Sequence, residues 1–319
     1  MSTFTIRSFK REDLDAVAAV HNAVFPEFPE TAEEIAGHDA QNPPGLIWER
    51  LVAEDAGRIV GVAKYTQSNL WAHLNKYSVD VIVHPDWQGQ GIGKALYGHM
   101  TAALEQHKAT QLKTVVRENQ VRGCRFAADR DFIEQLREQE SRLTVSGFEP
   151  STWVEAVRRV EADGITIRAY AELQDMRDLR ERIENLFWQI GQDIPQSEPP
   201  TRPPFEEWVK RFDRPGFLPD GNFVAFDGGI PVGTSVLWSR AANANLFTGT
   251  TGVIRSHRKR GIATALKVRA LTYAKQRGAP FVYTSNEVNN TGMLGINARL
   301  GFERLPSWMV LAKEVKNER

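Results

Sequence analysis

Two stretches of the sequence follow one pattern: PDWQGQGIGKAL at residues 85–96 and RSHRKRGIATAL at residues 255–266. Each contains Gln or Arg, two further residues, glycine, isoleucine, glycine or alanine, one variable residue and then Ala-Leu. After both, apolar residues recur at every fourth position, which is the spacing of a buried stripe on a helix. Each pattern therefore predicts the same local structure: a strand that ends, a tight glycine turn and a helix.

The match between the two halves of the chain keeps its register over a long distance. Gln88 and Arg258 are 170 positions apart, and the same separation relates ADRDF at 128–132 to ARLGF at 298–302. Further upstream, TIRSF (5–9) is repeated as TIRAY (166–170). A chance motif does not stay in register this far, so the repeat indicates a duplicated domain.

The repeat sets the expected domain organisation. We expect an N-terminal domain over residues 1–150, a connecting helix over 151–164 and a C-terminal domain over 165–319. Each copy is predicted to contain a β-hairpin, closed by Asp55-Ala56-Gly57 or by Asp227-Gly228-Gly229, and a strand ending at Val83 or Val253. The runs ESRLTV (140–145) and SWMVLAK (307–313) are expected to complete the two sheets.

The composition excludes several classes of protein. The 319 residues include 40 Lys and Arg against 40 Asp and Glu, and this balance argues against a nucleic-acid-binding surface. One cysteine excludes an intramolecular disulfide, and no apolar run is long enough to cross a bilayer. The N-terminal segment lacks the apolar core of a secretory signal, so we expect a cytoplasmic protein.

A glycine turn between a strand and a helix is chemically suited to bind an anion. The first amides of a helix lack backbone partners, and the helix dipole favours negative charge there. Gly91 and Gly261 let a phosphate approach the backbone without a Cβ in the way. Cations at a helix start are unfavourable without an anion, so the run Arg258-Lys259-Arg260 favours a polyanionic ligand in the second copy.

Two better-known phosphate motifs fit less well. The stretch GQGIGKA (89–95) is one residue short of a P-loop, and Ala95 stands where Ser or Thr would hold magnesium. A dinucleotide fingerprint needs G-x-G-x-x-G in a βαβ unit, and the second copy has Lys259 in place of its first glycine.

The pattern (Gln/Arg)-x-x-Gly-x-(Gly/Ala) after a strand instead resembles the acetyl-CoA motif of the GNAT N-acetyltransferase superfamily. Its tandem arrangement is similar to two-copy members such as mycothiol synthase. The resemblance implies an α+β fold of two tandem domains. Each would be a mostly antiparallel, twisted mixed α/β sheet with a splayed central pair of parallel strands, flanked by helices. It also implies that the pantetheine arm of acetyl-CoA lies in the splay, and that backbone N–H groups near Val253 or Ile254 polarise the thioester carbonyl.

The residues that this resemblance assigns to acetyl-CoA come from both copies. In the C-terminal copy they are Val253, Ile254, Arg258, Lys259, Arg260, Gly261, Ile262, Ala263, Thr264 and Asn290. In the N-terminal copy they are Val83, Gln88, Gly89, Gln90, Gly91, Ile92, Gly93 and Lys94.

The family's last helix usually carries Asn, then Tyr seven residues later, just ahead of Gly-Phe. The C-terminal copy has Asn290, then Asn297 in place of Tyr, then Gly301-Phe302. The N-terminal copy departs at three of these four places, so we expect the C-terminal copy to be catalytic. Asn297 would contact the departing sulfur, Tyr283 is an alternative proton donor and Glu287 a candidate base, although strand packing and solvation also account for the last two.

The acceptor is expected to be a small-molecule primary amine that attacks the thioester directly. Trp188 and Asp193 are candidates for its site, although solvation at a helix end also explains Asp193. Neither nucleic acid nor a membrane is expected as a partner. No metal is expected either, because no His pair has ligand spacing. The chain would act as a monomeric pseudo-dimer or a homodimer. Two alternatives remain: a non-catalytic acyl-CoA sensor, or acetylation of an amino-sugar thiol as by mycothiol synthase.

Overall fold

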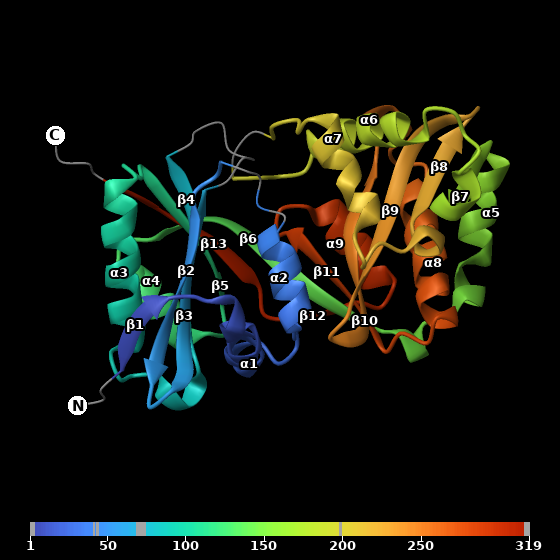
Figure 1. The fold of residues 1–319 in the computed structure, drawn as a ribbon. Helices are drawn as coiled ribbons and strands as arrows, with labels where there is room; N and C mark the ends of the chain where they lie inside the picture. The colour runs from blue at the N-terminus through green and yellow to red at the C-terminus, as the bar shows by residue number, and fades with distance from the viewer. Residues whose placement is uncertain (1–3, 41, 43–44, 68–74, 198–199, 316–319) are drawn as a thin grey trace. The chain divides into compact units, whose positions relative to one another are not determined.

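The computed structural model describes residues 4–40, 42, 45–67, 75–197 and 200–315 (Figure 1). Contacts between Cα atoms divide the chain into two compact units. Unit 1 consists of Met1–Leu136, Ala241–Asn243 and Trp308–Arg319, and unit 2 of Arg137–Arg240 and Ala244–Ser307. Each unit is a mixed sheet flanked by helices, as the sequence predicts.

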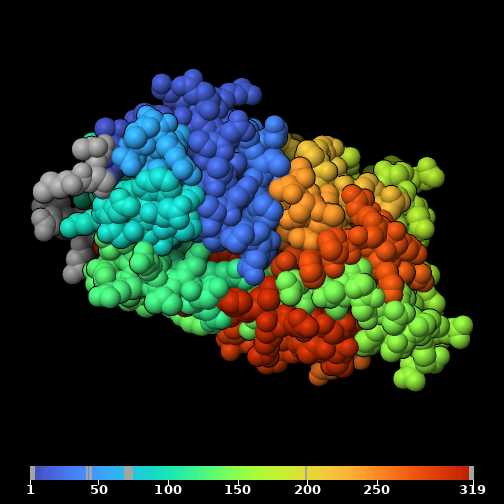
Figure 2. Space-filling model, turned by 90° about the horizontal axis from the view of Figure 1, so that it is seen from below, coloured from blue at the N-terminus to red at the C-terminus, as the bar shows by residue number. Residues whose placement is uncertain are grey.

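Unit 1 is built on six neighbouring strands. Their order in the sheet is β1 (Thr5–Ser8), β2 (Trp48–Asp55), β3 (Arg58–Gln67), β4 (Lys76–Val83), β5 (Gln111–Arg117) and β13 (Trp308–Glu314). All adjacent pairs are antiparallel except β4 and β5, which are parallel. Its helices are α1 (Leu14–Val24), α2 (Ala32–Ala40), α3 (Ile92–Gln106) and α4 (Val121–Ala128). Figure 2 shows that the N-terminal part of the chain, in blue, forms part of the outer surface of this unit.

Unit 2 repeats this plan. Its strand order is β6 (Ile133–Thr144), β11 (Phe281–Glu287), β10 (Asn243–Val253), β9 (Ile230–Arg240), β8 (Phe223–Asp227) and β7 (Ile165–Ala169), with β12 (Glu303–Arg304) also paired to β6. The β10–β11 pair is parallel. Its helices are α5 (Val154–Ala162), α6 (Leu179–Gly191), α7 (Phe205–Trp208), α8 (Ile262–Gln276) and α9 (Thr291–Arg299).

The predicted helical stripes form the cores of both units. On α3, Ile92, Leu96, Met100 and Leu104 are all at most 2% exposed. Their counterparts on α8 are buried as well and belong to the core of unit 2. The two predicted hairpins are present as β2–β3 and β8–β9. The region predicted as a connecting helix contains α5, which lies within unit 2, and the chain leaves this helix through Gly164 with φ +84°.

The last strand of each sequence copy lies in the unit of the other copy. Strand β13, from the end of the chain, pairs with β5 over seven residues of unit 1. Strand β6, from the first copy, pairs with β11 over seven residues of unit 2. Each sheet is therefore completed by a strand from the other repeat, which the sequence analysis did not foresee.

Candidate functional site

Both glycine turns adopt the same backbone conformation. Gly91 has φ +86° and ψ −7°, and Gly261 has φ +81° and ψ −4°. Two positions earlier, Gly89 and Lys259 also have positive φ, at +82° and +64°. This left-handed conformation favours glycine, so the turn places strain on Lys259 that Gly89 avoids. The shared geometry follows from the shared pattern.

The turns leave helix amides available. In each copy the first intrahelical bond, of 3.0 Å, runs to the glycine carbonyl from Ala95 or Ala265. The amides of residues 92–94 and 262–264 therefore precede the first amide that donates within the helix, and they point out of the helix end. Three such donors at a helix start form a site for a phosphate group.

The first residue of the motif holds the turn against its strand. The Gln88 Nε2 donates to the carbonyl of Val83 at 3.0 Å, and the Arg258 Nε donates to the carbonyl of Val253 at 3.1 Å. Glutamine and arginine thus perform the same task in the two copies, because both carry an N–H donor at a similar reach. This contact explains why the pattern tolerates either residue.

The parallel strands of unit 1 diverge beside the turn. Pairing joins Lys76–Ser78 to Gln111–Lys113, and a cavity of about 740 Å³ opens between the strands beyond that point. Its walls include residues 79–83 of β4 and 114–116 of β5. The predicted acetyl-CoA residues that line it are Val83, Gln88, Gly89, Gly91, Gly93 and Lys94. Ile92 is instead buried in the core, and the Gln90 side chain donates to the Asp86 carbonyl.

Two cations border the turn in unit 1. Lys94 lies in the first turn of α3 and lines the cavity. Arg122, from α4, also lines it, and its Nη1 would be 3.7 Å from a Cβ at Gly89. With the helix amides, these side chains give the part of the cavity beside the glycine turn a positive potential.

In unit 2 three arginines near the glycine turn are paired with acids. Asp193 accepts from the Arg255 Nε at 2.7 Å and also from Arg258. The guanidinium of Arg255, which has the larger effect, and that of Arg258 hold the pKa of the Asp193 carboxyl below its usual range. The Arg260 Nη1 lies 3.4 Å from the Asp227 Oδ2, which the His257 ring also contacts. Asp193, which we expected to face an acceptor amine, is thus hydrogen-bonded to two arginines that flank the Gly261 turn.

The predicted catalytic residues of the C-terminal copy are held in local contacts. Tyr283 is 4% exposed and its ring stacks on Phe247 at 5.4 Å. Glu287 is buried, and both its oxygens accept hydrogen bonds from Asn289. The Asn290 side chain accepts from the amide of Met293 and caps α9. Glu287 and Asn290 therefore shape the β11–α9 turn.

Asn297 is placed differently. It is 2% exposed, its Nδ2 donates to the Asn286 Oδ1 at 2.7 Å, and its buried Oδ1 lacks a partner in the described part of the chain. The equivalent residues of unit 1, Ala127 and Val116, line the large cavity. The second copy thus has a polar pair at positions where the first has apolar cavity wall.

The predicted acceptor region of unit 2 is largely filled by aromatic rings. Trp188 lies on α6 with the Arg202 guanidinium 5.7 Å from its ring centroid. A nearby cavity holds only about 120 Å³ and is lined in part by Phe187, Phe212 and Trp238. Gly249 and Thr250 of β10 also border it.

One residue of the large cavity escaped the sequence analysis. Asp80 lines it from β4, in the otherwise apolar run VDVIV at 79–83. Its side chain is exposed through the cavity, whose walls separate it from bulk water. This desolvation raises the pKa of its carboxyl to about 6, although the charges of His21 and Lys64 oppose the shift. A lone carboxylate within an apolar strand was the signal available in the sequence.

Metal and membrane features can be assessed over the described residues alone. In those ranges, no three His, Cys, Asp or Glu side chains gather as metal ligands would. Likewise, no helix in the described part of the chain is long and apolar enough to cross a bilayer.

Comparisons with known proteins agree with this geometry. The model of the acetyltransferase (GNAT) family matches residues 14–132 and again 180–302. The mycothiol acetyltransferase of Frankia casuarinae is 33% identical over 93 residues, which is 28% of this chain and only 22% of that protein. The chain thus spans about a fifth of that relative's length.

Solved structures share the fold over the whole chain. A tandem GNAT protein from the clavulanic acid biosynthesis pathway has a TM-score of 0.73 at 20% identity, covering 99% of this chain and 100% of that one. A GCN5-related N-acetyltransferase from Sphaerobacter thermophilus has a TM-score of 0.69 at 21% identity, covering 98% and 95%. With a family match in each half, the chain belongs to the GNAT acetyltransferase family and carries two copies of its domain.

Proposed function

We propose that the chain transfers an acetyl group from acetyl-CoA to the primary amine of a small molecule, and that the N-terminal copy binds acetyl-CoA. The observation that carries this proposal is the cavity of about 740 Å³ in unit 1, which joins the glycine turn to the gap between β4 and β5. Its volume lies in the range of pockets for cofactor-sized ligands.

The residues of this cavity fit the parts of acetyl-CoA. The amides of residues 92–94, with Lys94 and Arg122, would bind the diphosphate. The edge of β4 that turns away from β3 would pair with the amide groups of the pantetheine arm, as an added strand does. Apolar side chains such as Val81 and Phe126 would exclude water around the thioester.

This choice of copy differs from the sequence expectation of a catalytic C-terminal copy. The pairing of Arg258 with Asp193 favours the N-terminal copy, because a diphosphate at Gly261 would meet the Asp193 carboxylate beside Arg258. A like charge at such short range is repulsive even when solvent screens it.

A second candidate keeps the C-terminal copy as the site of transfer. The matching dihedral angles of Gly91 and Gly261 support it, as does the unpartnered Oδ1 of Asn297. In this version Asn297, Tyr283 and Glu287 would act near the thioester, with Asn290 and residues 253–264 around acetyl-CoA.

Calorimetry with three tryptophan variants separates the two versions. Acetyl-CoA is titrated into the wild type, Gly91→Trp, Gly261→Trp and the control Gly57→Trp. Gly57 also has positive φ and open space around a Cβ, but it lies in the β2–β3 turn, so it controls for backbone strain. We expect Gly91→Trp to abolish binding while the other two retain it. Loss with Gly261→Trp alone would support the second candidate.

Turnover is measured in parallel as release of the CoA thiol with spermidine, tyramine, glucosamine and p-anisidine. Tight acetyl-CoA binding without release of thiol with any amine would favour an acyl-CoA sensor. Release confined to glucosamine would favour an amino-sugar acceptor, the chemistry of the mycothiol acetyltransferase to which part of the chain is similar.

A further inference from the structure

Unit 2 contains a cavity of about 120 Å³ that neither version of the proposed function uses. It lies between α6, the segment before β8, and strands β8, β9 and β10, and aromatic rings form much of its wall. The Phe217 ring stands edge-on to that of Phe212, with 5.2 Å between centroids, and lies 5.8 Å from that of Trp238. An apolar cavity of about 150 Å³ binds benzene, so this space suits a ligand with one ring.

A buried amide in this wall has a donor without a partner. Asn222 precedes β8, lines the cavity and is 4% exposed. Its Oδ1 accepts from the Leu237 amide at 2.7 Å, whereas its Nδ2 lacks a partner in the described part of the chain. A buried donor costs free energy unless it finds an acceptor, so the Nδ2 favours a ligand that carries one.

A cation lies in the same wall. Arg211 is the sole charged side chain among the described residues that line the cavity, and its Nε donates to the Trp208 carbonyl at 3.1 Å. Burial lowers the pKa of its guanidinium to about 10, so the group keeps its charge at neutral pH. The nearby acid Glu184 is already bonded to Arg202, whose Nε donates to it at 2.9 Å, and Arg214 adds further positive charge. The cavity therefore combines a positive potential with an amide donor, and both favour an anion.

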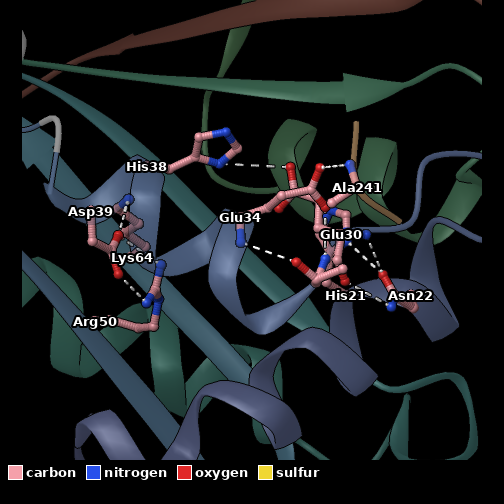
Figure 3. Close-up of polar contacts among 10 residues, drawn as sticks. His21, Asn22, Glu30, Glu34, His38, Asp39, Arg50, Lys64 and Ala241 are labelled. Atoms are coloured by element: carbon pink, nitrogen blue, oxygen red, sulfur yellow. Dashed lines mark hydrogen bonds and ion pairs between the residues drawn. The ribbon is translucent and has the colours of Figure 1, made fainter. Parts of the chain in front are cut away.

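Unit 1 shows what satisfies the donors at the equivalent position. The Phe9 amide donates to the carbonyl of Arg50 at 2.9 Å. The Tyr170 amide makes the same bond to the carbonyl of Asn222 at 2.7 Å, so Asn222 occupies the position of Arg50 in the repeat. Figure 3 shows the Arg50 guanidinium directed at Asp39, whose carboxylate accepts from it at 2.6 and 3.0 Å. In unit 1 a carboxylate of the chain itself therefore accepts the hydrogen bonds from this position.

We propose that the unit 2 cavity binds a small carboxylate whose apolar body is the size of one ring, such as benzoate. The carboxylate would accept from the Asn222 Nδ2 and the Arg211 guanidinium, and the ring would pack among the aromatic side chains of the wall. It would make, in unit 2, the contact that Asp39 makes with Arg50 in unit 1. The inference goes beyond the proposed function and holds whichever copy transfers the acetyl group.

Ligands of the same shape but another charge fit this wall less well. Aromatic rings also surround quaternary ammonium groups in proteins. Such a ligand would bring its positive charge beside Arg211, and among the described residues no acid lines the cavity to offset it. A ring compound without an acceptor atom would leave the Asn222 Nδ2 unpaired. The charge and the donor of the wall thus select the anion.

The test titrates the full-length protein by calorimetry with benzoate and with three matched compounds. Benzyl alcohol is neutral, benzylamine is cationic at pH 7, and 2-naphthoate has a second ring. We expect the wild type to bind benzoate more tightly than benzyl alcohol and benzylamine by about tenfold or more, since a hydrogen bond to a charged group contributes that factor. 2-Naphthoate should bind more weakly than benzoate, because its second ring exceeds the cavity volume.

Substitutions in the wall change the proposed contacts and leave the rings in place. Asn222→Asp keeps the oxygen that accepts from Leu237 and replaces the free donor by a charged oxygen, so benzoate affinity should fall by about tenfold or more and benzylamine should become the preferred ligand. Arg211→Met should weaken benzoate by a similar factor, and Arg211→Lys should restore part of the affinity. The control Arg177→Met removes an arginine of the same unit whose side chain is 95% exposed, and it should match the wild type.

Two further measurements check the fold of the variants and the place of binding. Benzoate should raise the thermal unfolding midpoint of the wild type more than that of Asn222→Asp or Arg211→Met, because a ligand stabilises the state that binds it. Benzoate affinity should be unchanged in Gly91→Trp, which alters the glycine turn of unit 1. Should Asn222→Asp not fold, the comparison of Arg211→Met with Arg211→Lys decides, since Arg211 is partly exposed.

Four results would overturn the inference. They are a wild type that does not bind benzoate, benzylamine affinity equal to that for benzoate, benzoate affinity within about threefold of the wild type in both Asn222→Asp and Arg211→Met, and loss of benzoate binding in Gly91→Trp. The last result would place the acid in the large cavity of unit 1. None of these results bears on acetyl-CoA binding, which is measured separately with the glycine variants.

Discussion

The exchange of last strands makes an unusual prediction for a point mutation. Leu311 on β13 is 6% exposed and packs in the core of unit 1, where it lies opposite Thr114 of β5. Leu143 on β6 is 4% exposed and packs in the core of unit 2, opposite Val282 of β11. Leu311→Ala, near the end of the chain, should therefore loosen the unit that holds the first 136 residues.

The magnitude follows from the lost packing. Replacing a buried leucine by alanine costs about 2–5 kcal/mol, depending on how far the cavity collapses. If β5 opens together with its unit, the lower limit corresponds to an increase of about 30-fold in amide exchange, since about 1.4 kcal/mol is a factor of ten. The expected increase is confined to the unit that contains the mutated strand.

Hydrogen–deuterium exchange with peptide resolution measures this effect. In Leu311→Ala, peptides over β5 (111–117) should exchange faster and those over β11 (281–287) should change little. Leu143→Ala is the matched control, because it should produce the opposite pattern. Faster exchange of β11 in Leu311→Ala, with β5 unchanged, would refute the exchanged arrangement.

Two further predictions concern buried charges. Lys267 is 2% exposed beside the Phe302 ring, and burial lowers its pKa to about 7, so the unfolded chain binds one more proton than the folded chain between about pH 7 and pH 10. The free energy of unfolding should therefore rise with pH in that window, and Lys267→Met should remove this rise and stabilise the protein at pH 7 by a few kcal/mol. Urea unfolding at pH 7 and pH 9.5 measures both effects, and an unchanged pH dependence in the variant would contradict the prediction. Asp13 is 6% exposed and accepts hydrogen bonds of 2.8 and 2.9 Å from Arg7, which hold the pKa of its carboxyl below the usual value. Asp13→Asn should lower the free energy of unfolding by about 1–3 kcal/mol at pH 7, and this difference from the wild type should shrink as the pH falls through about 4. Urea unfolding measures the difference, and a value that is constant with pH would argue against the charge pair.

Local chemistry explains how much of the fold was predictable. The glycine turns, the apolar stripes on α3 and α8 and the two hairpins are set by residues close together in sequence, so their patterns are legible without coordinates. The register of the repeat adds the duplication. The candidate anion sites follow directly, because an amide-rich helix start needs only the turn that precedes it.

The state of each candidate site depends on residues far apart in the sequence. Arg258 is neutralised by Asp193, 65 residues away, and nothing near either residue indicates that contact. The wall of the large cavity unites α1, β4, β5 and α4, so its volume depends on how side chains such as Ala127 and Asn297 fill equivalent space in the two copies. Neither feature has a periodic signal in the chain.

The sequence by itself determined that the domain is duplicated, where each turn and helix begins, and that the family uses acetyl-CoA chemistry. Only the tertiary structure decided which copy keeps an open cleft, which cations are already paired, and which sheet receives β6 and β13. The physical reason is that the residues of a strand specify which of its faces is buried, but not which sheet edge accepts it. The choice of edge depends on long-range backbone pairing and packing, which the local pattern does not encode.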